Sequence, residues 1–242
     1  MFLFYTPNIN TEKYLSAEES AHCVRVLRLG PGDEIMLTDG KGITYEARIT
    51  NPNPHRCEFE ITHCERLHKN WNYNLHIAIA PTKNTERLEW MVEKCTEIGI
   101  DEITPLLCRF SERKTINTER LQRVIVSAAK QSLKAYMPKL NPLTDYNTLV
   151  SQATERQKYI AHCYKDQKTQ LIEALRKSDS QSEEKSILIL IGPEGDFSEQ
   201  EVKDALNRGF IAVALGNERL RTETAGVAAC HTVAVDNLLN IK

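Results

Sequence analysis

Three patterns are absent from this chain of 242 residues, and each absence excludes a class of protein. No run of about 18 apolar residues occurs, which argues against a membrane-spanning helix. The opening MFLFYTPNIN becomes polar too early for a signal peptide. The seven cysteines include no C-x-x-C pair, and their odd number favours reduced thiols over a disulfide framework. We therefore expect a soluble, cytoplasmic protein with no membrane partner.

Metal ligands with a recognised spacing are also missing. Cys57 and Cys64 lie near His55, His63 and His68, but these intervals match no standard zinc pattern. We therefore predict that the protein binds no metal.

An excess of positive charge is missing too. The 31 Lys and Arg residues are balanced by 33 Asp and Glu residues, so the formal net charge is -2. Proteins that hold nucleic acid by overall charge are strongly basic, so any such binding here must use a local patch. The chain does have hydrophobic residues, 41% of the total, which can supply a substantial core.

The first 70 residues predict a small β-domain. In the stretch 33–50, Ile35 and Leu37 precede a turn rich in glycine and aspartate, and Tyr45, Ala47 and Ile49 alternate after it, which indicates a hairpin. Further turns follow closely, so a compact barrel is expected. A short helix over 16–27 interrupts the strands, with Ser and Glu in capping-box register at 16 and 19.

From residue 71 to 242 the pattern changes to alternating strands and helices, which predicts a second domain with a mainly parallel sheet. Strands are expected at 75–80, 101–107, 158–163, 186–192 and 211–215, and helices at 84–99, 119–136, 167–177, 198–208 and from about 223. A polar surface loop is expected at 179–185. The fully apolar stretch SILILIG is typical of a strand buried inside a parallel sheet.

Two loops of this second domain favour a ligand site. LIGPEGDFSEQEV (190–202) and ALGNERLRTETAG (214–226) each follow a predicted strand, and ligands bind beyond the carboxyl ends of such strands. Gly192, Gly195 and Gly216 would let the main chain approach a ligand, although for each one alone a sharp turn is the better explanation. Neither loop has a phosphate-binding motif or a nucleophile elbow. The residues alone therefore predict a ligand site without naming its ligand.

The paired loops closely resemble the signature of the SPOUT methyltransferases. More narrowly, the chain resembles the bacterial family that methylates N3 of one uridine in small-subunit ribosomal RNA. HCVRVLRLGPGDEIMLTDGKG (22–42) is similar to that family's PUA-like, RNA-binding barrel, and APTKNTERLEWMVEKCTEIGIDEITPLLCRFSERK (80–114) is similar to the opening of its catalytic domain. The resemblance implies a PUA-like barrel at 1–70 and a SPOUT domain at 71–242, with a deep trefoil knot that departs from the usual rule against knots.

The resemblance also implies S-adenosylmethionine as the methyl donor, bound in the knot. Its contacts would come from His162, Ile191, Gly192, Gly195, Leu215, Gly216, Leu220, Arg221 and Thr222. Three features depart from the family pattern. Asp196 and Leu133 stand where the family often has glycine, and the second loop ends in Ala225 and Gly226, where other small or hydroxyl residues are frequent.

The expected reaction assigns further roles. Glu194 is the carboxylate nearest the expected pocket and is interpreted equally well as a base or as a structural brace, whereas Arg221 is expected to stabilise a developing uridine oxyanion. Candidate phosphate contacts are Arg25, Arg28, Arg113, Lys114 and Arg123. The small residues at 224–230 are explained by close packing within the monomer, and the resemblance implies that this last helix also packs in a homodimer, which we favour. Because the chain is nearly neutral, an assembled 30S particle is a more suitable substrate than free RNA.

Two alternatives remain at this point. A non-enzymatic RNA-binding protein would not need the paired donor loops. A SPOUT relative that methylates transfer-RNA ribose would need them, but the predicted N-terminal barrel favours the ribosomal uridine methylase.

Overall fold

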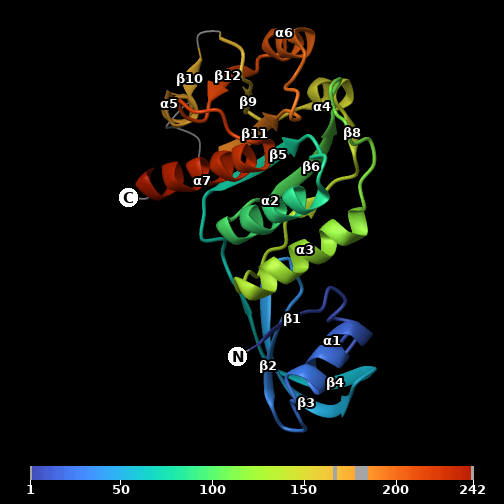
Figure 1. Cartoon of the computed structure of the whole chain (residues 1–242). Helices are drawn as coiled ribbons and strands as arrows, with labels where there is room; N and C mark the ends of the chain where they lie inside the picture. Colours follow the sequence, from blue (N-terminus) through green and yellow to red (C-terminus); the bar gives the residue numbers. More distant parts are fainter. Residues whose placement is uncertain (1, 166–167, 178–184, 241–242) are drawn as a thin grey trace. The chain divides into compact units, whose positions relative to one another are not determined.

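The computed structural model of the chain describes residues 2–165, 168–177 and 185–240 (Figure 1). They form two compact units. Of the described residues, those up to 70 together with 126–137 make up one unit, and 71–125 with those from 138 onward make up the other. The sequence pattern changes at the same boundary near residue 70. The return of 126–137 to the first unit is a difference from the single break that the pattern predicts.

The first unit is built on a four-stranded sheet. Its strands are β1 (Leu3–Tyr5), β2 (Glu34–Thr38), β3 (Ile43–Asn53) and β4 (Arg56–Arg66), in that order, with β1 parallel to β2 and the other pairs antiparallel. The predicted hairpin is therefore confirmed as β2 and β3. Its alternating apolar side chains are buried in one core, because successive residues of a strand point to opposite faces. Closure of this sheet into a barrel stays a prediction.

The predicted helix at 16–27 is divided in two. It begins as α1 (Ala17–Ala21) and continues as a π-helical turn, η1 (His22–Val26). Ser16 caps α1 as predicted, since its Oγ accepts a hydrogen bond from the Glu19 main-chain N–H at 3.2 Å. The Glu19 carboxylate is instead paired with Lys130 Nζ at 2.6 Å. A partner more than a hundred residues away is not visible in the local capping pattern.

The second unit has a parallel sheet, as predicted. Its strands are β5 (Tyr73–Ile79), β6 (Glu102–Leu107), β7 (Lys139–Leu140), β8 (Thr144–Asp145), β9 (Gln157–Ala161), β10 (Thr169–Gln170), β11 (Lys185–Ile191) and β12 (Ile211–Ala214). The order is β10-β12-β9-β11-β5-β6-β7, with β8 paired to β6, and all these pairs are parallel. The apolar strand β11 lies between β9 and β5, and its last five residues are buried. This placement explains its lack of polar alternation.

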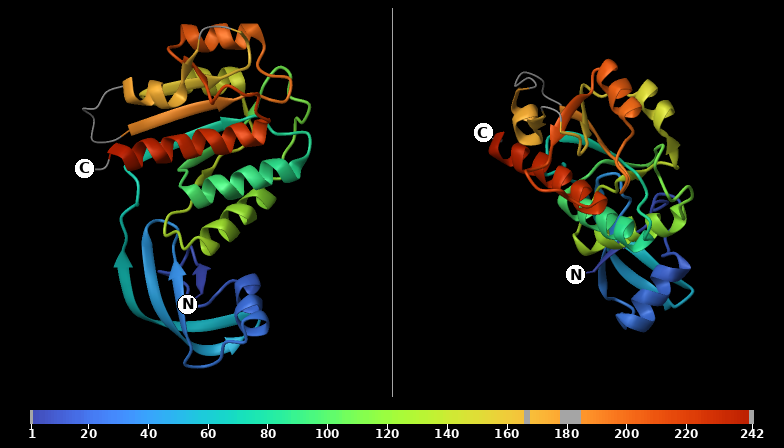
Figure 2. Two further views of the ribbon diagram at one scale, coloured as in Figure 1. Left: turned by 60° about the vertical axis from the view of Figure 1, so that its left-hand side comes forward. Right: turned by 45° about the horizontal axis from the view of Figure 1, so that its top comes forward.

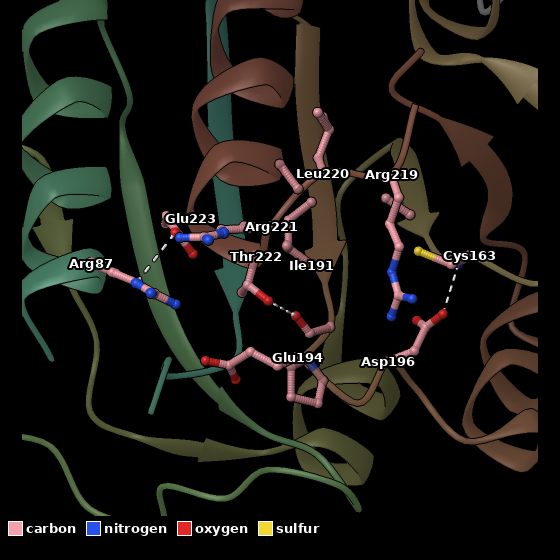
Figure 3. A pocket seen from close by; sticks show the side chains of 14 residues that line it. Arg87, Cys163, Ile191, Glu194, Asp196, Arg219, Leu220, Arg221, Thr222 and Glu223 are labelled. Atoms are coloured by element: carbon pink, nitrogen blue, oxygen red, sulfur yellow. Dashed lines mark hydrogen bonds and ion pairs between the residues drawn. The ribbon is translucent and has the colours of Figure 1, made fainter. Parts of the chain in front are cut away.

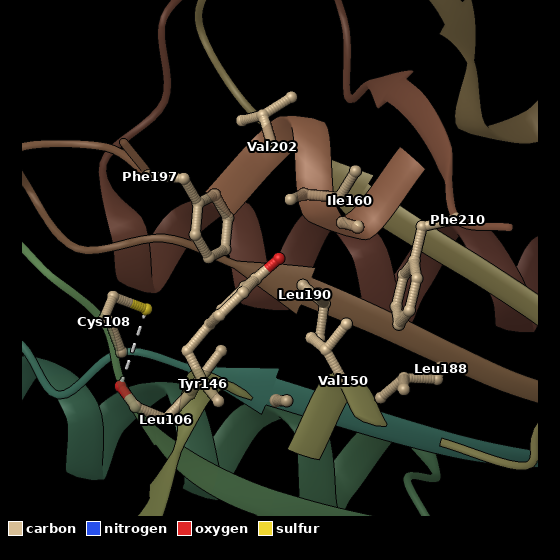
Figure 4. Close-up of a cluster of buried hydrophobic side chains, with 13 residues drawn as sticks. Leu106, Cys108, Tyr146, Val150, Ile160, Leu188, Leu190, Phe197, Val202 and Phe210 are labelled. Carbon is tan, nitrogen blue, oxygen red and sulfur yellow. Dashed lines mark hydrogen bonds between the residues drawn. The ribbon is translucent and has the colours of Figure 1, made fainter. Parts of the chain in front are cut away.

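Helices cover both faces of this sheet. On one face, α2 (Thr85–Ile98) and α7 (Thr222–Asn240) lie side by side, and α5 (Leu171–Lys177) packs against α7 (Figure 2). On the other face, α4 (Tyr146–Gln152) and α6 (Glu199–Asn207) pack onto buried strand residues around Tyr146, Leu190 and Phe197 (Figure 4). A Cβ at Gly226 would lie 2.8 Å from Met91 Cε, so glycine there permits the close contact of α7 with α2.

The remaining differences from the predictions have local causes. The helix expected at 119–136 is α3 (Thr118–Gln131), and it ends early because Leu133 adopts a left-handed backbone with φ 54°. The segment expected as one helix at 167–177 contains strand β10 before α5. The two-residue strands and the short α4 give no measurable sequence period. Most of the surface loop expected at 179–185 lies outside the described residues.

The two positions at which the family resemblance leads us to expect glycine share one conformation. Leu133 has φ 54° and Asp196 has φ 67°, both in the left-handed region. Glycine adopts this region without strain, and Asp tolerates it better than Leu because a short polar side chain can hydrogen-bond locally. The left-handed conformation therefore costs more conformational free energy at Leu133 than at Asp196.

Candidate active site

Three loops meet at the carboxyl end of the parallel sheet. Ile191 at the end of β11 pairs with Ala161 at the end of β9, and Ala161 pairs in turn with Val213 of β12. This register brings the loops that follow the three strands to one edge. It is the edge at which open α/β sheets bind ligands.

Two adjoining cavities open among these loops. The first has a volume of about 370 Å³, and the second about 480 Å³. Of the residues expected at the donor site, the first cavity is lined by Ile191, Gly192, Leu220, Arg221 and Thr222. The second is lined by His162, Leu215, Gly216 and Leu220. The structure thus brings eight of the nine residues to one connected site, within the size range usual for ligand pockets.

The expected glycines have three different surroundings. Gly195 is the ninth residue and lines neither cavity, since a Cβ added there would lie 3.3 Å from Phe110 Cβ. A Cβ at Gly192 would lie 3.1 Å from the main-chain nitrogen of Phe197, so the tight turn itself requires glycine. Gly216 has φ 128° and no atom within 4 Å of an added Cβ. Only at Gly216 does open space of the second cavity adjoin a backbone that favours glycine.

Side-chain hydrogen bonds connect the loop after β11 to the neighbouring segments of the chain. Thr222 Oγ1 donates to the Gly192 carbonyl at 3.1 Å, and Glu194 Oε1 accepts from the Lys83 main-chain N–H at 2.9 Å. Asp196 Oδ2 accepts from the Cys163 main-chain N–H at 2.7 Å. Glycine at position 196 would supply no such acceptor. The carboxylate therefore joins the loops after β9 and β11, which the sequence could not reveal because its partner is 33 residues away.

The first cavity has charged groups of both signs. In Figure 3, Arg219 and Asp196 are drawn on one side of Thr222, and Arg87 and Glu223 on the other. Arg87 Nε lies 3.7 Å from Glu223 Oε1. The sequence analysis did not identify Arg87 and Glu223 as residues of the site. Glu223 could have been found from its position two residues after Arg221.

Two carboxylate oxygens at this cavity have unused hydrogen-bonding capacity. Among the described residues, neither Glu194 Oε2 nor Glu223 Oε2 has a hydrogen-bond partner, although both atoms are buried. Cys163 also lines the cavity, and burial together with the neighbouring Asp196 raises the pKa of its thiol. A raised pKa disfavours the thiolate form of this side chain.

The candidate RNA contacts have different surroundings. Arg113 donates from Nη2 to the Lys83 carbonyl at 2.7 Å and from Nε to the Thr82 carbonyl at 3.2 Å, so it stabilises the loop before α2. Lys114 and Arg123 are exposed on the second unit. Arg25 and Arg28 are exposed on the first unit, at the end of η1 and just beyond it. Arg28 has a left-handed φ of 57°.

Neither a metal cluster nor a membrane span is found in the part of the chain that the structure describes. No three His, Cys, Asp or Glu side chains there are grouped to hold a metal ion. No helix there is long and apolar enough to cross a membrane.

The fold and the site together define an α/β protein with a ligand cavity formed by loops at the carboxyl edge of its sheet. Residues 69–234 match the model of an RNA methyltransferase domain, and residues 15–62 match an RNA methyltransferase PUA domain. The chain belongs to this RNA methyltransferase family.

Individual relatives agree with this assignment over nearly the whole chain. Ribosomal RNA small subunit methyltransferase E of Rickettsia conorii is 28% identical and is aligned over 91% of this chain and 88% of its own length. A probable rRNA methyltransferase from Porphyromonas gingivalis is 39% identical, with a TM-score of 0.91 and 99% of each chain covered. A ribosomal RNA small subunit methyltransferase E from Neisseria gonorrhoeae, solved bound to S-adenosyl methionine, is 29% identical with a TM-score of 0.78, covering 96% of this chain and 95% of that one.

Proposed function

We propose that this protein transfers a methyl group from S-adenosylmethionine to N3 of one uridine in small-subunit ribosomal RNA. The observation that carries the proposal is the connected pair of cavities, which gathers eight of the nine residues expected at the donor site. The Neisseria relative, which bears the small-subunit methyltransferase name, was solved with the same donor bound. Membership of the RNA methyltransferase family supports RNA as the acceptor.

The residues present fit the donor. Open space beside Gly216 in the second cavity leaves room for a nucleoside against the loop main chain. Thr222 and Asp196 hold the loop after β11 in place through their hydrogen bonds to Gly192 and Cys163, so the cavity walls are fixed before binding. When bound, the donor supplies a methyl group activated by a positively charged sulfur. Fixed walls favour catalysis by positioning, which supplies on the order of 7–11 kcal/mol in favourable cases.

Arg221 and Glu194 differ in what their contacts allow. Arg221 lines the first cavity, and we assign it the stabilisation of negative charge that develops on the uridine oxygen. Glu194 already accepts a hydrogen bond from Lys83, and we assign it mainly the role of a brace for the loop after β11.

The wider assembly is also part of the proposal. The PUA-type first unit, with exposed Arg25 and Arg28, would contact RNA phosphates together with Lys114 and Arg123, and an assembled 30S particle in the cytoplasm would be the substrate. The proposal also includes closure of the first unit into a barrel, a trefoil knot in the second unit and formation of a homodimer through α7. At Gly226 the packing against Met91 within the chain already accounts for the small residue, so the dimer depends on the rest of α7.

The test is direct. Small-subunit particles from a strain that lacks the modification are incubated with the protein and labelled S-adenosylmethionine, and the product is mapped. We expect one methyl group per particle, on N3 of a uridine, and weaker transfer to free ribosomal RNA. Label on ribose or only on transfer RNA would favour the transfer-RNA relative, and RNA binding without any transfer would favour a binding protein.

A further inference from the structure

The acceptor side of the site can be located from how its cavities connect. The first and second cavities adjoin, since both are lined by Ala161, Cys163, Arg219, Leu220 and Ala225. On the other side, Arg87, Arg221 and Glu223 line both the first cavity and a third one of about 380 Å³, which continues along α2 to Trp90. The first cavity, which holds part of the proposed donor site, therefore lies between the second cavity and the third one, and Glu223 lines it on the side of the third. An acceptor base reaches the methyl group from the side opposite the donor.

Glu223 is a buried carboxylate with hydrogen-bonding capacity to spare. The residue is 7% exposed. Its Oε1 lies 3.7 Å from Arg87 Nε, which is an ion-pair distance and too long for a hydrogen bond. Its Oε2 has no hydrogen-bond partner in the described parts of the chain. A buried acceptor without a partner costs about 1–3 kcal/mol, so the fold retains Glu223 at the cavity in spite of a penalty.

The position of Glu223 at the start of α7 does not explain this burial. A negative charge near a helix N-terminus is favourable, but an exposed residue provides that benefit equally well. Glu199 does so in the first turn of α6, where its side chain is 74% exposed. Glu194 is the other carboxylate with a free oxygen at the cavity, but its second oxygen is already bonded to the Lys83 N–H.

We propose that Glu223 is the catalytic base, which accepts the proton from the acceptor nitrogen; this inference rests on the proposed function. In the transfer, the N3–H bond and the carbon–sulfur bond break, the bond from N3 to the methyl carbon forms, and the electron pair of the carbon–sulfur bond stays on sulfur. One proton is left over. The Glu223 carboxylate takes it, so the positive charge lost from sulfur is balanced by the negative charge lost from Glu223.

The charged groups around Glu223 suit this role. Arg87 and Glu86 come from α2, Arg221 from the loop before α7 and Glu194 from the loop after β11. Arg87 is a positioning residue, because its guanidinium orients the carboxylate without using up either oxygen in a hydrogen bond. Arg221 faces the same cavities and can stabilise the uridine oxygen while Glu223 takes the proton.

The experiment compares Glu223→Gln with the wild type in single-turnover transfer to small-subunit particles across a range of pH. We expect the rate constant of the variant to fall by about 10²–10⁴-fold near neutral pH. Its rate should then rise about tenfold per pH unit, because without a base only the ionised imide reacts. The wild type should instead reach a plateau. Calorimetric titration with S-adenosylmethionine should give the same affinity for both proteins, because Glu223 is not among the residues expected to contact the donor and does not line the second cavity.

Two further variants serve as controls. Glu223→Asp keeps a carboxylate and should recover part of the rate and the plateau. Glu199→Gln makes the same change at a glutamate that also lies in the first turn of a helix but is far more exposed than Glu223. This variant should behave as the wild type. An active wild type with an equally active Glu223→Gln, or a Glu223→Gln whose loss of rate is matched by loss of donor affinity, overturns this inference alone. A wild type that transfers nothing to uridine overturns the proposed function and the inference with it.

Discussion

Asp196 and Leu133 both adopt a left-handed backbone conformation, but only Asp196 has a side chain that contributes to the site. Asp196 uses its left-handed backbone to place a carboxylate between two loops of the site, where it accepts hydrogen bonds from Cys163 and Phe197. Leu133 adopts the same backbone region with a side chain that is 59% exposed. Its strain is therefore not offset by burial.

Replacing Leu133 by glycine should stabilise the protein. A left-handed backbone costs a non-glycine residue about 1–2 kcal/mol, and the extra freedom of glycine in the unfolded chain offsets about 0.4–1 kcal/mol of the gain. We expect Leu133→Gly to raise the free energy of unfolding by up to about 1.5 kcal/mol in urea denaturation. Gln131→Gly, at the last position of α3, should instead lower it. A destabilised Leu133→Gly would show that its side chain contributes more than its backbone costs.

Gly216 is the residue at which strain and ligand access can be told apart. Gly216→Val should weaken S-adenosylmethionine binding by at least about tenfold in calorimetry, since the new side chain projects into the second cavity. Gly209→Val is the matched control. Gly209 also has a positive φ, 83°, and open space around it, but it lines neither cavity. Equal loss of donor affinity in both variants would attribute the effect to strain and remove Gly216 from the donor pocket.

At the scale of whole elements, a polar network stabilises the second unit on the sheet face opposite α2. His76 of β5 bonds through Nδ1 to Glu155 Oε1 at 2.8 Å and through Nε2 to Thr104 Oγ1 of β6 at 2.7 Å. Asn141 Nδ2 donates to the same Thr104 oxygen at 2.7 Å. The Thr104 hydroxyl is then free to donate to Nε2, which leaves the Nδ1 proton for Glu155.

Because of this network, the stability of the second unit should decrease as the pH falls into the acid range. Burial raises the pKa of Glu155, but its hydrogen bond to His76 and further bonds to main-chain groups outweigh that effect and leave the pKa below the ordinary value. A carboxyl group with a lowered pKa in the folded state contributes stability that is present above its unfolded pKa and is lost as the pH falls through the folded value. Glu155→Gln should lower the melting temperature at pH 7 and flatten its decline below about pH 4.5. Glu173→Gln, at an exposed site in α5, should leave both unchanged.

The elements differ in how far the sequence could predict them. Strand β11 was predictable because burial on both faces requires a continuous apolar run. Helix α2 was predictable because its buried side chains form one apolar stripe and Gly99 ends the helix. The short α4 and the two-residue strands could not be predicted, since they form only where tertiary pairing supplies their contacts. In the site, the glycine-containing loops were predictable, but the ion pair of Arg87 with Glu223 was not, because it joins residues distant in sequence.

At the scale of the whole molecule, one unit of the PUA type and one RNA methyltransferase unit are joined in a nearly neutral chain. The division between the units falls within α3, whose residues from 126 onward belong to the first unit. Overall charge cannot hold RNA strongly here, so recognition has to depend on local cations and on the shape of the substrate. This is the physical reason for expecting a folded particle as the substrate.

The central claim is the identity of the modified nucleoside, and one measurement tests it most directly. Small-subunit ribosomal RNA from a strain in which this chain is deleted is digested to nucleosides and analysed by mass spectrometry, beside the same strain carrying the wild-type chain. The account predicts that N3-methyluridine is absent after deletion and returns with the wild-type chain. An unchanged content of N3-methyluridine, or loss of a ribose-methylated nucleoside in its place, would contradict it.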